Sequence, residues 1–132
     1  MLPYLVVGIG GAIGAITRYV TVIASQDLWG LRFPYATLMV NCIGSLLAGM
    51  LLAILVGRYN AGEYWRLFVF TGFLGGYTTF SSFAAENLFL IEQAQWNKLF
   101  LNITLNNIGS LALVWAGTFI AKRFILQHLI FE

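Results

Sequence analysis

Residues 72–83 read G-F-L-G-G-Y-T-T-F-S-S-F and interrupt one of the long apolar runs of this chain near its middle. Glycine lowers helix propensity, and Ser and Thr side chains compete for backbone hydrogen bonds. The sequence therefore predicts a helix that is broken at its centre. A continuous helix with a glycine-packed face is the alternative interpretation.

The composition around this stretch is that of a membrane protein. Of the 132 residues, 60% are hydrophobic and 9% are charged, and the mean hydropathy is +0.84. A soluble domain carries roughly 25% charged residues, so an ordinary water-soluble fold is excluded. The net charge of +2 is too small to indicate nucleic-acid binding, and the single cysteine, Cys42, cannot form an internal disulfide.

Four apolar stretches reach the length of about 20 residues that a helix needs to cross a bilayer. They are residues 4–24, 35–56, 67–91 and 99–120. Three of the four tryptophans, Trp29, Trp65 and Trp96, lie at the predicted membrane edges, as expected for an aromatic belt. We therefore expect an all-α membrane protein with a single four-helix transmembrane domain over residues 1–132.

Basic residues are spread almost evenly over the two predicted faces of the membrane. One face carries Arg58, Arg66, Lys122 and Arg123, and the other carries Arg32 and Lys98, joined by Arg18 if its side chain snorkels that way. Such a small bias does not fix one orientation under the positive-inside rule. Insertion in both orientations would permit an antiparallel dimer.

Polar residues recur every fourth position in two of the spans, and so form one stripe on each helix. The second span carries Thr37, Asn41 and Ser45, and the fourth carries Asn102, Asn106 and Ser110. These stripes either line a pathway or form hydrogen bonds between helices, and spacing alone favours neither. Small residues four apart, such as Gly10 and Gly14, instead predict close packing of helices.

The predicted break offers groups that could contact ions. In lipid, non-helical backbone is tolerated only where protein or a watery cavity covers it. Carbonyl groups freed near Gly75 and Thr78 would suit a hard cation such as Na⁺, and the hydroxyls of Ser81 and Ser82 could donate to an anion.

Two aromatic and two charged side chains allow more than one role. Phe80 and Phe83 share a helix face, which ordinarily faces lipid or core, but the positive edge of an aromatic ring can also meet an anion. Glu86, the only carboxylate inside a predicted span, fits a proton-coupling site, a polar anchor or a partner in a pathway. Arg18 fits an interfacial anchor or a positive charge at a pathway mouth.

The sequence contains no recognisable catalytic set. Its only histidine, His128, follows the fourth span, Cys42 has no histidine near it in sequence, and neither zinc-ligand spacing nor a phosphate-binding loop occurs. Enzyme activity is therefore not expected.

Four sequence blocks, one in each span, carry a family resemblance. They are G-G-A-I-G-A-I-T-R-Y at 10–19, P-Y-A-T-L-M-V-N-C-I-G-S at 34–45, G-F-L-G-G-Y-T-T-F-S-S-F-A-A-E at 72–86 and N-N-I-G-S at 106–110. These blocks resemble the Fluc-type fluoride channels, also called the CrcB family. The resemblance extends to about Arg123 and keeps the order of the blocks in the family. It implies a multi-pass protein of a prokaryotic cell membrane, which exports fluoride passively from the cytoplasm.

The same resemblance implies an antiparallel, dual-topology homodimer with two fluoride pathways along its interface. The carbonyl oxygens of Gly75 and Thr78 from both subunits would hold a central structural Na⁺. The residues that match the pathway of the family are Asn41, Phe80, Ser81, Ser82, Phe83, Glu86 and Ser110, with Arg18 at the vestibule. Asn106 is assigned to the same pathway. Asn102 and Asn106 stand where relatives carry other polar or aromatic groups, and Ser82 stands where many members have Thr.

Two other functions are considered. A small proton-coupled exporter of the four-helix multidrug type would use Glu86, but such exporters need a carboxylate in the first span, which is absent from residues 4–24. In a membrane assembly subunit without transport activity, the polar stripes would only join helices.

Overall fold

The computed structural model describes residues 1–58, 62–125 and 127, and the regular secondary structure of these residues is all helical. The predicted all-α membrane fold is thereby confirmed. His128 lies outside the described residues, as does most of the tail that follows the fourth span.

Four helical spans follow one another along the chain. The first is α1 (Leu2–Trp29), and the second is α2 (Tyr35–Leu51) with its continuation η1 (Leu52–Arg58). The third consists of α3 (Glu63–Arg66), η2 (Leu67–Leu74), α4 (Gly75–Tyr77) and α5 (Phe80–Glu92). The fourth consists of α6 (Trp96–Thr104), η3 (Leu105–Gly109), α7 (Ser110–Ile120) and η4 (Ala121–Ile125), and the η segments are wider, π-helical turns.

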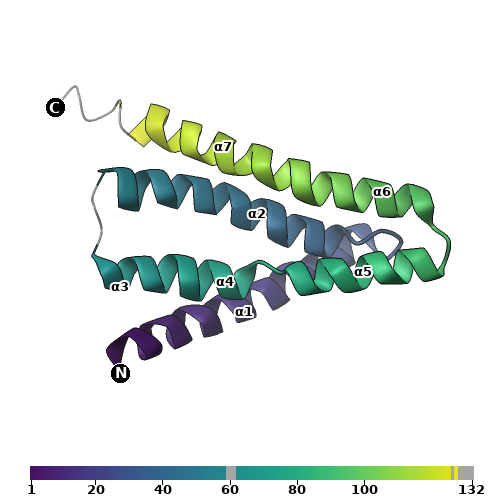
Figure 1. Cartoon of the computed structure of the whole chain (residues 1–132), viewed down its shortest axis with the longest axis horizontal. Coiled ribbons are helices and arrows are strands. Elements are labelled where there is room, and N and C mark those ends of the chain that lie inside the picture. Colours follow the sequence, from purple (N-terminus) through teal and green to yellow (C-terminus); the bar gives the residue numbers. More distant parts are fainter. Residues whose placement is uncertain (59–61, 126, 128–132) are drawn as a thin grey trace.

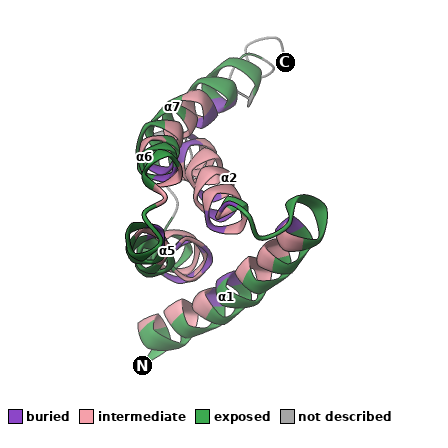
Figure 2. Cartoon of the chain, turned by 90° about the vertical axis from the view of Figure 1, so that its right-hand side faces the viewer, coloured by how far each residue is buried: buried purple, intermediate pink, exposed green. Residues whose placement is uncertain are grey.

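The second, third and fourth spans run side by side, and α1 crosses them at an angle (Figures 1 and 2). Within the described residues, three continuous helices are long and apolar enough to cross a membrane, namely Leu2–Trp29, Tyr35–Val56 and Trp96–Phe124. The third span is divided between α4 and α5, and Figure 1 shows the short link between these two helices.

The link is the predicted break. Thr78 (φ −77°, ψ 159°) and Thr79 (φ −150°, ψ 120°) are both extended, so the helical hydrogen-bond ladder stops there. The Thr79 side chain starts the next helix, since its Oγ1 accepts a hydrogen bond from the Ser82 N–H at 3.2 Å. The expectation of a helix broken at its centre is thus confirmed.

Glycines bring α1 and the third span into backbone contact. A Cβ atom at Gly10 would lie 3.0 Å from the Phe73 nitrogen, and one at Gly14 would lie 3.0 Å from the Tyr77 nitrogen. A similar contact joins α2 to α7, where a Cβ atom at Gly49 would lie 3.0 Å from the Thr118 nitrogen. The prediction of close packing is confirmed, because any side chain at these positions would meet backbone atoms.

Many large apolar residues are exposed. Figure 2 shows the exposed residues on the outer surfaces of the helices and the buried residues in narrow strips that face inward. Tyr4, Leu111 and Trp115 are among the most exposed. Such a surface is expected where the chain contacts lipid or a second membrane protein rather than water.

Candidate functional site

Asn41 on α2 forms hydrogen bonds with both backbone groups of Thr79 at the break. Its Nδ2 donates to the Thr79 carbonyl at 3.0 Å, and its Oδ1 accepts from the Thr79 N–H at 2.9 Å. The second Nδ2 hydrogen goes to Oδ1 of Asn106 at 2.9 Å. Both donors of the Asn41 amide are therefore engaged, and this side chain replaces backbone hydrogen bonds that the break removes.

Replacing Asn41 with Asp is expected to lower the free energy of unfolding by about 2 kcal/mol or more, because unpaired buried acceptors cost about 1–3 kcal/mol each. The carboxylate still accepts from Thr79, but it cannot donate to the Thr79 carbonyl or to Asn106. Thermal unfolding of the detergent-solubilised protein measures the change. Asn107→Asp is the control, since the exposed Asn107 amide donates, within the described residues, to the Ile103 carbonyl of its own helix alone. Equal losses in the two variants would contradict this role of Asn41.

The break also changes the bonding of the carbonyl groups at Gly75 and Thr78. In a continuous helix the Thr79 N–H would donate to the Gly75 carbonyl, but here it donates to Asn41. The Thr78 carbonyl accepts from Nη1 of Arg18 at 3.3 Å. Both predicted cation ligands thus lie at or next to the break, and the Arg18 side chain extends to it.

A pocket of about 380 Å³ opens beside the break and gathers residues from three spans. The predicted pathway residues in its lining are Asn41, Phe80, Phe83, Asn106 and Ser110. The rings of Phe80 and Phe83 are 5.3 Å apart and tilted by 56°. Phe83 is 7% exposed and Phe80 is 75% exposed, so one ring packs within the chain and the other projects outward. The polar groups of α2 and the fourth span therefore face an aromatic pair across this pocket.

Two of the predicted pathway hydroxyls, those of Ser81 and Ser82, lie beside this pocket and not in its lining. Ser81 and Ser82 are both exposed in the first turn of α5. The Thr79 hydroxyl donates to Oγ of Ser82 at 3.1 Å and lies 3.4 Å from Oγ of Ser81. The three hydroxyls form one cluster where α5 begins.

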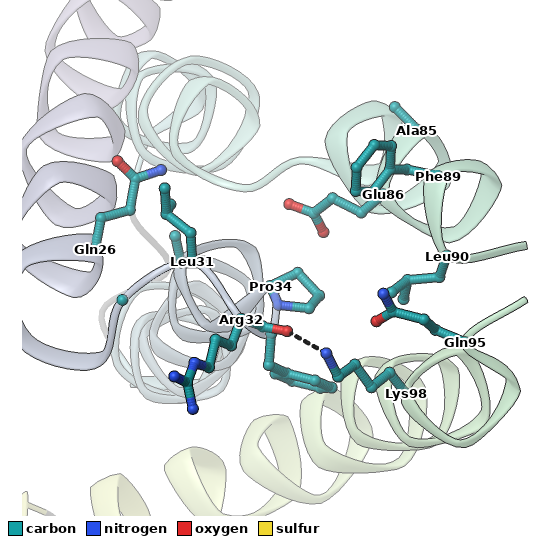
Figure 3. Close-up of a pocket in the computed structure, with 13 residues that line it drawn as sticks. Gln26, Leu31, Arg32, Pro34, Ala85, Glu86, Phe89, Leu90, Gln95 and Lys98 are labelled. Carbon is teal, nitrogen blue, oxygen red and sulfur yellow. Dashed lines mark hydrogen bonds between the residues drawn. The ribbon is translucent and has the colours of Figure 1, made fainter. Parts of the chain in front are cut away.

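Glu86 lines a second pocket, of about 520 Å³, at the end of the helices near the link between α1 and α2. Figure 3 shows its carboxylate extending from α5 toward Pro34 and Leu31. Oε1 accepts a hydrogen bond from the Thr37 hydroxyl, and Oε2 is buried without a partner in the described part of the chain. Glu86 is thereby separated from the pocket of the aromatic pair.

Lys98 is a basic residue of this second pocket that the sequence interpretation did not select. Its Nζ donates to the Arg32 carbonyl at 2.8 Å, as the dashed line in Figure 3 shows. Lys98 precedes Asn102 by four residues, so extending the polar stripe of the fourth span by one turn would have identified it.

The fold and the site define a small multi-pass membrane protein with a polar pocket at a broken helix. The chain belongs to the CrcB family, because the model of "CrcB-like protein, Camphor Resistance (CrcB)" matches residues 5–118. The family resemblance of the four sequence blocks is thereby confirmed.

Curated relatives match most of the chain. A "Fluoride-specific ion channel FluC" of Legionella pneumophila (strain Lens) is 58% identical over 126 residues, which are 96% of this chain and 94% of the relative. A relative of the same name from Vibrio parahaemolyticus is 42% identical over 111 residues, covering 84% of this chain and 87% of the relative. A third, from Caulobacter, is 40% identical over 124 residues, covering 93% and 97%.

Proposed function

We propose that this protein is a passive, fluoride-selective channel of the bacterial cell membrane. The observation that carries the proposal is the pocket beside the break, where Asn41 shapes the backbone and the Phe80 and Phe83 rings face polar groups. The names of the similar bacterial proteins point to the same ion.

Fluoride is small and strongly hydrated, so a pathway has to replace several water molecules at once and still bind the ion weakly enough to release it. Neutral donors meet both needs, because hydroxyl and amide groups bind an anion without a full positive charge. Ser81, Ser82 and Ser110 supply hydroxyls near the aromatic pair, and the edges of the Phe rings add a weakly positive surface. Fluoride that enters as hydrogen fluoride dissociates inside the cell, so the expected net flow through the channel is outward.

We infer that the working unit is an antiparallel homodimer with two pathways. The even distribution of basic residues over both faces permits insertion in both orientations. Phe80 projects from the break with 75% of its surface exposed, which leaves this ring available to a second copy. Other large apolar side chains along the outer faces offer further contact area.

A structural Na⁺ between two copies fits the chemistry of the break. The Gly75 and Thr78 carbonyls are hard oxygen donors, but two oxygens from one chain are too few for a hard cation. A second chain would supply two more, so the site would be complete only in the dimer. The ion would add a fixed positive charge beside the pathways. The Arg18 guanidinium is a second positive charge close by, because it donates to the Thr78 carbonyl.

The channel is tested with purified protein in liposomes loaded with potassium fluoride and potassium chloride. We expect rapid fluoride efflux when a potassium ionophore balances the charge, and no efflux of chloride. Proton-dependent uptake of an organic cation, without fluoride efflux, would instead support the multidrug-type exporter based on Glu86. Protein-free liposomes measure the leak of hydrogen fluoride.

Sodium is expected to stabilise the solubilised dimer. A ligand that binds only the folded state stabilises it by RT ln(1 + [L]/Kd), or about 2.7 kcal/mol at 100 times Kd. We therefore expect the thermal unfolding midpoint to rise when NaCl replaces KCl at constant ionic strength. Equal midpoints in NaCl, KCl and choline chloride would argue against the Na⁺ site.

A further inference from the structure

Four asparagine side chains form a head-to-tail chain of hydrogen bonds, which we call the amide chain. Asn41 Nδ2 donates to Asn106 Oδ1 at 2.9 Å, Asn106 Nδ2 to Asn102 Oδ1 at 2.8 Å, and Asn102 Nδ2 to Asn87 Oδ1 at 2.9 Å. The amide chain thus starts at the break, crosses to the fourth span and returns to α5. Each of the first three amides donates to the next, and Asn87 only accepts.

Burial fixes the direction of the amide chain. Asn102 is 0% exposed and Asn106 is 6% exposed, so water does not substitute for their partners. Turning either amide over would place oxygen against oxygen on one side and N–H against N–H on the other, and unpaired buried polar groups are costly. The orientation of the half-buried Asn87 is therefore set by Asn102, which binds its Oδ1.

Asn87 is the last member of the amide chain, and the N–H groups of its side chain are not used within it. Its Oδ1 is engaged by Asn102, whereas its Nδ2 has no acceptor within the described part of the protein. An amide held in this way presents two N–H groups and withholds its carbonyl oxygen. Such a group can donate two hydrogen bonds to an anion, while its oxygen is turned toward Asn102.

The position of Asn87 continues the aromatic pair. Asn87 follows Phe80 by seven residues and Phe83 by four on α5, so the three share one helix face. Four residues of helix advance about 6 Å, which places Asn87 one turn beyond Phe83. On the fourth span, Asn102 lies between Asn106 of the pocket beside the break and Lys98 of the second pocket. The pair of Asn102 and Asn87 thus lies between the two pockets.

We propose that Asn87 binds fluoride in the pathway after the aromatic pair, and that Asn102 is a positioning residue that turns the Asn87 N–H groups toward the ion. This inference rests on the proposed channel function. It adds a neutral donor to the proposed pathway, at a position between the two pockets. It also gives the buried Asn102 a role in the passage of an anion that Asn102 does not contact.

Asn87→Leu and Asn87→Asp test the binding role. Leucine removes both donors, and aspartate also places a negative charge beside the pathway. Since a hydrogen bond to a charged group is worth about tenfold or more in binding, we expect both variants to lower fluoride efflux by at least about tenfold. Gln93→Glu is the matched control, because it makes the same amide-to-carboxylate change at the exposed end of α5, outside both pockets, and its efflux is expected to equal that of the unmodified protein.

The positioning role is tested by a double-mutant cycle. Asn102→Asp still accepts from Asn106 but no longer donates to Asn87, so we expect it to lower efflux in the otherwise unmodified protein. In the Asn87→Leu background it should lower efflux no further, because the group that it orients is gone. A purely structural Asn102 would lower efflux in both backgrounds, and that result would overturn the positioning role.

Size-exclusion chromatography establishes that the variants keep the oligomeric state of the unmodified protein. Efflux through either folded Asn87 variant at the level of the Gln93→Glu control would overturn the binding role. If the unmodified protein itself released no fluoride, the proposed channel would fail, and the two failures are thus distinguishable.

Discussion

Replacing Phe83 with isoleucine is expected to reduce fluoride efflux to the level of protein-free liposomes. Isoleucine retains an apolar side chain in this buried position, but it has no aromatic ring and therefore no positive ring edge for an anion. The same replacement at Phe80 is expected to have the same effect, because the two rings form one pair with centroids 5.3 Å apart. Ion-selective electrode recordings of reconstituted protein measure the efflux.

Phe119→Ile is the matched control for both replacements. Phe119 stacks on Trp115 at 5.9 Å on the outer face of α7, and it lines neither pocket. This variant should conduct normally. Undiminished efflux through folded Phe80→Ile and Phe83→Ile proteins would contradict the assignment of the aromatic pair to the pathway.

Replacing Gly14 with alanine is expected to lower the free energy of unfolding by about 2–3 kcal/mol, although alanine is normally the better helix former. The added Cβ atom would overlap the Phe73 carbonyl and lie 3.0 Å from the Tyr77 nitrogen. Both are backbone groups, so α1 has to move away from the third span. The hydrogen bond of 3.1 Å between Thr21 and Tyr77, which joins the same two helices, would be strained as well.

Gly8→Ala in the same helix serves as the comparison. A Cβ atom there would have no heavy atom within 4 Å, and the gain in helix propensity predicts a stabilisation of up to about 1 kcal/mol. Unfolding of the two solubilised variants by titration with sodium dodecyl sulfate measures the difference. A Gly14→Ala protein as stable as Gly8→Ala would show that α1 does not depend on this close contact.

The break was predictable because its cause is local. Gly75, Gly76 and the following hydroxyl residues weaken a helix wherever they occur, and the structure has its extended residues at Thr78 and Thr79. The position of Asn41 in a polar stripe was also visible. Its role at the break was not, because the Thr79 groups that it binds are 38 residues away in sequence.

The two interpretations of the polar stripes were left open by the sequence, and the structure contains elements of both. Asn102 and Asn106 join α5, α2 and the fourth span by hydrogen bonds, as expected for residues that connect helices. Asn41, Asn106 and Ser110 also line the pocket beside the break. A stripe identifies the face of a helix on which polar groups lie, but it does not identify the groups opposite them.

Glu86 and Asn87 are neighbours on α5, and the sequence did not identify the groups opposite them either. Their side chains point to different partners, Thr37 of α2 for Glu86 and Asn102 of α6 for Asn87. Glu86 stands out in the sequence because a carboxylate inside a span is rare, whereas Asn87 is one of several asparagines in the spans. Only the positions of the facing helices distinguish the two residues.

The sequence by itself determined the membrane environment, the apolar spans and the broken third helix, because transfer of side chains into lipid and helix propensity depend on residues close together in the chain. The tertiary structure decided which side chain binds which, from the contact of Arg18 with the Thr78 carbonyl to the direction of the amide chain. Hydrogen bonds are short and directional, so their partners are set only when segments that are far apart in sequence pack together.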